Sequence, residues 1–122
     1  MAHILVVDDD ASIQDLIKDV LAMQSHTVDA ASSASEALKK IRAARYDLAI
    51  VDRTMPEMDG LQLVKVLRSA AATKDLKVLM CTAKDLMVDA EEAFAAGAND
   101  YIVKPLDFAK LAAKVALLTK KA

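Results

Sequence analysis

Disulfides, aromatic clusters and long apolar runs are all missing from this sequence. Its 122 residues include one cysteine, Cys81, and no tryptophan, and only 3% of them are aromatic. A single cysteine cannot form a disulfide within the chain, which suits a reducing compartment. No apolar run reaches the roughly 18 residues that cross a membrane, and the first residues lack the charged region and cleavage site of a signal peptide. We therefore expect a cytoplasmic protein without a membrane partner.

An excess of positive charge is also absent. The chain has 16 lysines and arginines against 18 acidic residues, a net charge of -2, and no basic run is longer than a pair such as Lys120-Lys121. Nucleic-acid-binding domains usually carry a concentrated basic surface, so we expect no direct nucleic-acid partner. Hydrophobic residues make up 55% of the chain, which excludes a disordered protein. The length predicts one domain, residues 1–122.

Short apolar runs alternate with amphipathic stretches along the whole chain. The runs are typical of strands that are buried on both faces. The expected strands cover residues 3–7, 27–31, 47–52, 77–81 and 100–104. The expected helices have apolar residues at helical spacing and cover residues 11–24, 33–44, 61–71, 85–96 and 107–121. Strict alternation predicts an α/β fold, a parallel sheet with helices on both faces and right-handed crossovers.

Polar side chains with reactive groups stand where several of these strands end. In chain order they are Asp8, Asp9, Asp10, Asp52, Thr82 and Lys104. Ligands of parallel sheets bind beyond the carboxyl ends of the strands, so we expect these side chains to converge at one edge. Asp10 is the exception, because an acid at this place more often caps the following helix.

The expected cluster has the chemistry of a phosphoryl site. Neighbouring carboxylates raise each other's pKa values unless a cation lies among them. Oxygen ligands without histidine or cysteine select a hard ion, and a few carboxylates with one carbonyl and water suit Mg²⁺ better than Ca²⁺. The hydroxyl of Thr82, backbone N–H groups and the ammonium of Lys104 fit phosphoryl oxygens. Asp52 is then a nucleophile that forms an acyl phosphate.

Four segments at these strand ends carry a family resemblance. They are LVVDDD, DLAIVDRTMPEMDGL, VLMCTAKD and GANDYIVKP. In this order, the four resemble the receiver domain of bacterial response regulators over the full length of the chain, in the manner of a stand-alone chemotaxis regulator. The resemblance implies a doubly wound, flavodoxin-like (βα)5 fold with a five-stranded parallel sheet in the order 2-1-3-4-5.

The resemblance also implies roles for the acidic residues. Asp52 is expected as the phosphoacceptor. Asp8, Asp9 and Asp52 are expected to hold Mg²⁺, Asp9 directly and Asp8 more through water, with the backbone carbonyl of Thr54 as a further ligand. Thr54, and Lys84 two residues beyond the threonine of the fourth strand, are expected to tune water access and the lifetime of the phosphoryl group.

The switch residues follow from the same resemblance. Thr82 is expected to contact the phosphoryl group and to change position with it, and Lys104 to pair with it. Tyr101 is expected to rotate as the aromatic reporter of the switch. A cis peptide bond is expected between Lys104 and Pro105.

The implied function is a phosphorylation-activated switch in a two-component phosphorelay. A histidine kinase or phosphotransfer protein would donate the phosphoryl group, and the surface of residues 86–96, 100–104 and 107–120 would control a downstream protein. Such a domain is not an enzyme beyond catalysing its own phosphoryl transfer and dephosphorylation. The chain would be either a stand-alone receiver or part of a longer protein.

Three alternatives remain beside this reading. A degenerate receiver would bind partners without phosphorylation, although every core residue of the pattern is present here. A phosphatase of the haloacid dehalogenase type also uses an aspartate nucleophile and Mg²⁺, but it needs a second acid where Thr54 stands. A dinucleotide-binding module needs a glycine-rich turn after the first strand, and VVDDDAS has none.

Overall fold

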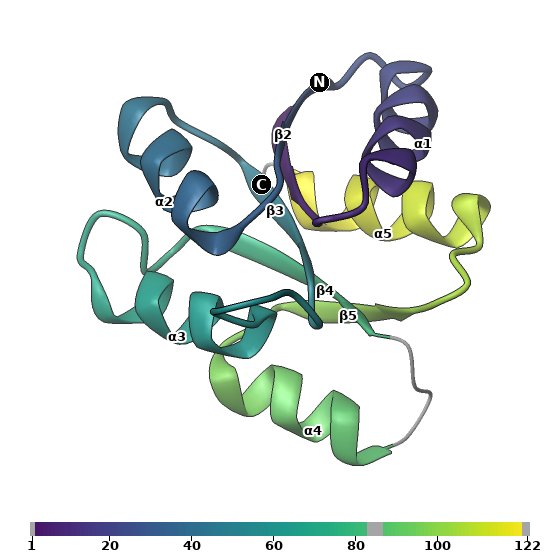
Figure 1. The fold of residues 1–122 in the computed structure, drawn as a ribbon. Helices are drawn as coiled ribbons and strands as arrows, with labels where there is room; N and C mark the ends of the chain where they lie inside the picture. The colour runs from purple at the N-terminus through teal and green to yellow at the C-terminus, as the bar shows by residue number, and fades with distance from the viewer. Residues whose placement is uncertain (1, 83–86, 121–122) are drawn as a thin grey trace.

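The computed structural model describes residues 2–82 and 87–120, which form alternating strands and helices (Figure 1). The strands are β1 (His3–Val7), β2 (Thr27–Ala31), β3 (Leu48–Asp52), β4 (Lys77–Thr82) and β5 (Asp100–Val103). The helices are α1 (Ala11–Ala22), α2 (Ala34–Ala43), α3 (Gly60–Ser69), α4 (Met87–Ala96) and α5 (Phe108–Thr119). The alternation predicted from the sequence is confirmed, with boundaries that differ by a few residues.

The five strands form one parallel sheet in the order β2-β1-β3-β4-β5. This is the order that the family resemblance implied, and it is confirmed. After β2 the chain returns to the other side of β1, so the strand order reverses between β1 and β3. The carboxyl ends of these two strands therefore flank the point at which ligands of such sheets usually bind.

Two apolar layers cover the sheet. Side chains of α1 and α5 pack on one face with alternate residues of the central strands. Side chains of α2, α3 and α4 pack on the opposite face, and Figure 1 shows the same division of helices. All residues of β3 are buried, and so is β1 apart from His3. The edge strand β2 is only partly buried, which explains its weak apolar signal in the sequence.

Side-chain caps set the beginnings of most helices. Asp10 caps α1 by accepting hydrogen bonds from the N–H groups of Ser12 and Ile13, so the prediction for this acid is confirmed. Ser33 caps α2 and Asp107 caps α5. These caps satisfy backbone donors that have no partner inside the helix.

No helix in the described part of the chain combines the length and the apolar character that a membrane crossing requires.

Candidate functional site

Three acidic side chains meet at the carboxyl edge of the sheet. Asp52 is the last residue of β3, and Asp8 directly follows the neighbouring strand β1. Oxygens of Asp8, Asp9 and Asp52 all lie within 4.8 Å of one another. Asp8 and Asp52 are buried, with 3% and 6% of their surface exposed, whereas Asp9 is exposed. The site is therefore a cluster of two buried carboxylates and one exposed carboxylate.

Lys104 brings a positive charge to this cluster. Its Nζ lies 3.0 Å from Oδ1 of Asp52 and 3.6 Å from Oδ2 of Asp8. The backbone N–H of Lys104 donates to the carbonyl of Thr82 at 2.7 Å, which ties the end of β5 to the end of β4. The lysine thus reaches the acids from the end of β5.

Burial and neighbouring charges shift the pKa values of Asp8 and Lys104 in this cluster. Burial is the main reason that the pKa of Asp8 is raised, and the nearby carboxylates of Asp52 and Asp9 raise it further against the hydrogen bond from Asp10 and the charge of Lys104. For Lys104, burial acts to lower the pKa, but the hydrogen bond and charge of Asp52 and the charge of Asp8 outweigh it and raise the pKa. The cluster is therefore short of positive charge even with the lysine in place.

Backbone groups orient the acids. The N–H of Thr54 donates to Oδ1 of Asp52 at 3.3 Å, and the N–H of Asp10 donates to Oδ1 of Asp8 at 2.8 Å. Thr82 is the last residue of β4 and is 3% exposed. Its strand neighbours β3, so Thr82 lies at the same sheet edge as Asp52.

Tyr101 lies on β5, three residues before Lys104. Its ring makes an edge contact with Phe94 of α4, with centroids 6.0 Å apart, and Nζ of Lys114 lies 5.7 Å from its centroid. The tyrosine therefore connects β5 with both α4 and α5. The Lys104–Pro105 peptide bond is cis. Lys84 lies outside the described residues.

Gln14 supports the backbone beside the acidic cluster, and the sequence analysis did not select it. Its amide Nε2 lies 2.5 Å from the carbonyl of Asp8 and 3.2 Å from both the carbonyl of Ala31 and the hydroxyl of Ser32. It is buried in α1, on the same side as Ile17 and Leu21. A polar residue on the apolar stripe of a helix was the available signal.

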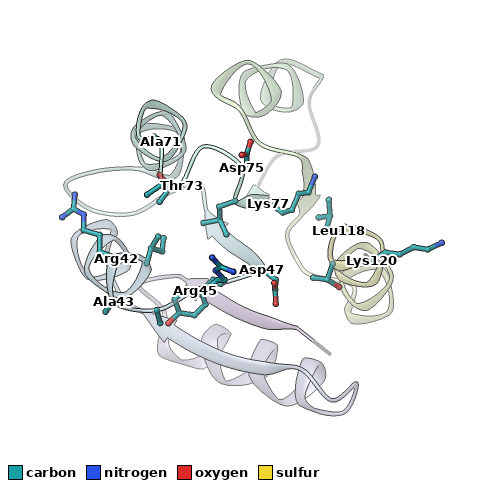
Figure 2. Close-up of a pocket in the computed structure, with 16 residues that line it drawn as sticks. Arg42, Ala43, Arg45, Asp47, Ala71, Thr73, Asp75, Lys77, Leu118 and Lys120 are labelled. Atoms are coloured by element: carbon teal, nitrogen blue, oxygen red, sulfur yellow. The ribbon is translucent and has the colours of Figure 1, made fainter. Parts of the chain in front are cut away.

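A hollow lies at the opposite edge of the sheet, where the strands begin. Its volume is about 760 Å³, and its lining includes Asp47 before β3, Lys77 at the start of β4 and Lys120 after α5. Figure 2 shows Arg42 and Lys120 on opposite sides of this hollow, so its cations do not converge on one point. It shares no residue with the acidic cluster, and we assign the chemistry to the carboxyl edge.

A comparison of the sequence with known protein families decides the family. The model of the response regulator receiver domain matches residues 4–116. The chain belongs to this family. Mg²⁺ and an aspartyl phosphate are features of response regulator receivers, which in general are not enzymes and receive phosphoryl groups from histidine kinases.

Several individual proteins are similar to this receiver. It is 39% identical over 118 residues to the two-component response regulator PhoP of Pseudomonas aeruginosa, covering 97% of this chain and 52% of that protein. It is 36% identical to the transcriptional regulatory protein ResD of Bacillus subtilis, covering 98% and 48% of the two chains. The receiver thus spans about half the length of these regulators.

Solved structures agree with the family assignment. The chemotaxis protein CheY4 of Vibrio cholerae superposes with a TM-score of 0.91 at 33% identity, covering 97% of this chain and 98% of that chain. The receiver domain of the Francisella response regulator 1452 superposes with a TM-score of 0.92 at 30% identity, covering 98% and 97%.

Proposed function

We propose that this receiver, residues 1–122 as one domain, is a phosphorylation-controlled switch with Asp52 as its phosphoacceptor. One observation carries the proposal: the buried carboxylate of Asp52 lies beside two further acids and 3.0 Å from the ammonium of Lys104. The donor is a histidine kinase or a phosphotransfer protein. The reaction belongs in the cytoplasm, and the chain catalyses only its own phosphoryl transfer and dephosphorylation.

The acidic cluster fits a magnesium ion. Asp8, Asp9 and Asp52 would hold it together with the backbone carbonyl of Thr54. The donors are all oxygens, as Mg²⁺ prefers, and a cation would relieve the crowding of charge that raises the pKa of Asp8. When bound, the ion neutralises negative charge on the transferring phosphoryl group.

The side chains of the receiver perform the transfer itself. A carboxylate oxygen of Asp52 attacks the phosphorus, and an acyl phosphate forms as the bond to the donor breaks. Lys104 pairs with one phosphoryl oxygen, and the hydroxyl of Thr82 donates to another. Thr54 and Lys84 tune the access of water and so the lifetime of the acyl phosphate.

The output follows from Thr82 and Tyr101. When the Thr82 hydroxyl turns toward the phosphoryl group, it vacates space that the Tyr101 ring then occupies. The result is a shift between two packings of the same fold, with a coupling free energy of about 1–3 kcal/mol. The output surface consists of the described parts of α4, β5 and α5. A hollow lined by Tyr101, Lys110 and Lys114 lies on this surface, where a downstream protein would bind.

The competing functions are distinguishable. A degenerate receiver would bind its partner equally well without phosphate, whereas the charged cluster around Asp52 favours phosphorylation. A phosphatase with an aspartate nucleophile needs a general acid at position 54, and threonine there disfavours it.

Mass spectrometry of the protein incubated with Mg²⁺ and acetyl phosphate tests the proposal. We expect one phosphoryl group, which peptide mapping places on Asp52, because a carboxylate nucleophile forms an acyl phosphate. Asp52→Asn should abolish the addition. Asp15→Asn removes an exposed acid of α1 and should label like the unmodified protein. Equal labelling of the Asp52→Asn variant would refute the assignment.

A further inference from the structure

An ion pair joins the phosphoacceptor loop to α4. Arg53 directly follows Asp52, and its backbone N–H donates to the carbonyl of Cys81 at 2.8 Å. Its Nη2 donates to Oε2 of Glu92, 2.6 Å away and 39 residues later in the chain. The two side chains are 25% and 44% exposed. One end of the pair thus belongs to the loop that carries the nucleophile, and the other end belongs to the proposed output surface.

Residues 90–96 of α4 bury few apolar side chains. Between residues 90 and 96, the side chains that are buried are those of Ala93 and Ala96, while Phe94 is 48% exposed. Alanine buries little apolar area, so it contributes little hydrophobic free energy. The ion pair of Glu92 adds a polar contact to this limited apolar packing of residues 90–96.

The carboxyl end of α4 is anchored separately. Nε of Arg68 on α3 donates to the carbonyl of Gly97 at 2.9 Å, and Nη2 donates to Oδ1 of Asn99 at 3.0 Å. Gly97 has a φ of 114°, which turns the chain sharply after the helix. These hydrogen bonds do not involve Glu92, so losing the contact at Glu92 leaves them intact.

We infer that the Arg53–Glu92 pair is a latch that holds α4 in the unphosphorylated packing and opens when Asp52 is phosphorylated. The inference rests on the proposed function. An acyl phosphate dianion would replace a carboxylate monoanion on the residue that precedes Arg53, so the negative charge on this loop would increase. This charge competes with Glu92 for the guanidinium. Arg53 and Glu92 are thus positioning residues that transmit the state of Asp52 to α4.

Amide hydrogen exchange measured by NMR tests the latch. The unmodified protein is compared with Glu92→Gln and with Glu91→Gln, which removes a neighbouring exposed carboxylate of the same helix. Each is measured with Mg²⁺ alone and with Mg²⁺ and beryllofluoride, an analogue of the phosphoryl group. With Mg²⁺ alone, amides 90–96 should exchange about two- to fivefold faster in Glu92→Gln, as expected for a partly exposed ion pair. Glu91→Gln should match the unmodified protein.

The response to beryllofluoride separates a latch from a merely structural contact. Beryllofluoride should accelerate exchange of amides 90–96 in the unmodified protein by a similar factor, and should add little in Glu92→Gln because the pair is already broken. Arg53→Gln should reproduce the behaviour of Glu92→Gln, and the double variant should add nothing. Equal exchange in Glu92→Gln and Glu91→Gln would overturn the latch, as would an undiminished response to beryllofluoride in Glu92→Gln.

Failure of the proposed function gives a different result. If beryllofluoride does not bind, or binds equally to Asp52→Asn by fluorine NMR, then Asp52 is not the phosphoacceptor and phosphorylation does not open the latch. The comparison with Mg²⁺ alone still decides whether the Arg53–Glu92 pair holds α4.

Discussion

Lys104 lies between two carboxylates, 3.0 Å from Asp52 and 3.6 Å from Asp8. Under the proposed function, an ammonium there would compensate the acids before the phosphoryl group arrives and pair with a phosphoryl oxygen afterwards. Its place at the end of β5 depends on the hydrogen bond from its N–H to Thr82. The same side chain therefore serves both states of the site.

Lys104→Gln should slow the labelling of Asp52 by acetyl phosphate about a hundredfold, because a preorganised charge at the developing negative charge is lost. The rate is measured by intact mass against time. Lys110→Gln changes an exposed lysine of α5. It keeps the hydrogen bond that the backbone N–H of residue 110 donates to Oδ1 of Asp107. This control should label at the unmodified rate. Equal rates for the two variants would remove Lys104 from the mechanism.

Tyr46 predicts a dependence of stability on alkaline pH. Burial and the hydrogen bond from its hydroxyl to Asp29, 2.8 Å long, raise its pKa to about 12. The folded pKa lies above the unfolded value of about 10. This contribution to stability is therefore complete below pH 10 and is lost as the pH rises toward about 12.

Urea unfolding at several pH values measures this effect. Between about pH 10 and 12, the unmodified protein should lose about 1–2 kcal/mol more of its unfolding free energy than Tyr46→Phe, after allowance for solvent screening. Parallel losses in the two proteins would show that the Tyr46–Asp29 bond does not carry the effect.

Residues at strand ends were predictable, and their long-range partners were not. Asp8, Asp52 and Lys104 stand where buried runs stop, and parallel topology brings such ends together. Arg53 and Glu92 are separated by 39 residues and belong to a loop and a helix. Only the tertiary packing of α4 brings them together, so no local pattern could indicate the pair.

Among the elements, the start of α3 is the one most closely tied to the site. The sequence predicted a helix from residue 61, and Gly60 is the first residue of α3, with Asp59 as its cap. A Cβ at Gly60 would lie 2.4 Å from the carbonyl oxygen of Asp52 and 2.9 Å from Cα of Arg53. The glycine is required because the backbone of the phosphoacceptor passes directly against it.

Gly60→Ala should destabilise the fold by about 1–3 kcal/mol, because the clash is with backbone that must shift. It should also slow the labelling of Asp52, since the displaced backbone carries the nucleophile. Gly97→Ala is the control: it strains a position with φ 114°, so it should lower stability and leave labelling unchanged. Urea unfolding and labelling rates measure the two effects. Normal labelling in Gly60→Ala would contradict this account.

The elements themselves follow from local patterns, but the order of the strands does not. Apolar runs and caps such as Asp107 identify where strands and helices begin and end. Periodicity does not say which strands are neighbours, so the order β2-β1-β3-β4-β5 came from the family resemblance. The sequence predicted a helix from residue 33, but Ser33 has an extended backbone and caps α2.

For the whole molecule, the acidic cluster predicts that Mg²⁺ stabilises the fold. With a dissociation constant in the millimolar range, as expected for few protein ligands, about ten times that concentration of Mg²⁺ should add about 1.4 kcal/mol. Asp9→Asn should remove most of this gain, because it replaces the carboxylate expected to bind the ion directly.

Thermal unfolding with and without Mg²⁺ measures the gain. Asp15→Asn changes an exposed acid of α1 that is not part of the cluster, and it should retain the gain. An undiminished gain in Asp9→Asn, Asp8→Asn and Asp52→Asn alike would place the ion elsewhere.

The proposed switching also belongs to the scale of the whole molecule, since it would couple the carboxyl edge of the sheet to the surface of α4, β5 and α5. The contacts of Tyr101 with Phe94 and Lys114 join these three elements. Thr82 and Lys104 connect them to Asp52 through the ends of β4 and β5.

Amide NMR of the protein with Mg²⁺, before and after addition of beryllofluoride, tests the central claim most directly. The account predicts large shifts at residues 8–9 and 52–54 and across the described parts of α4, β5 and α5. It also predicts a changed environment of the Tyr101 ring, and no response in Asp52→Asn. Shifts confined to the loops after β1 and β3, or the same shifts in Asp52→Asn, would contradict it.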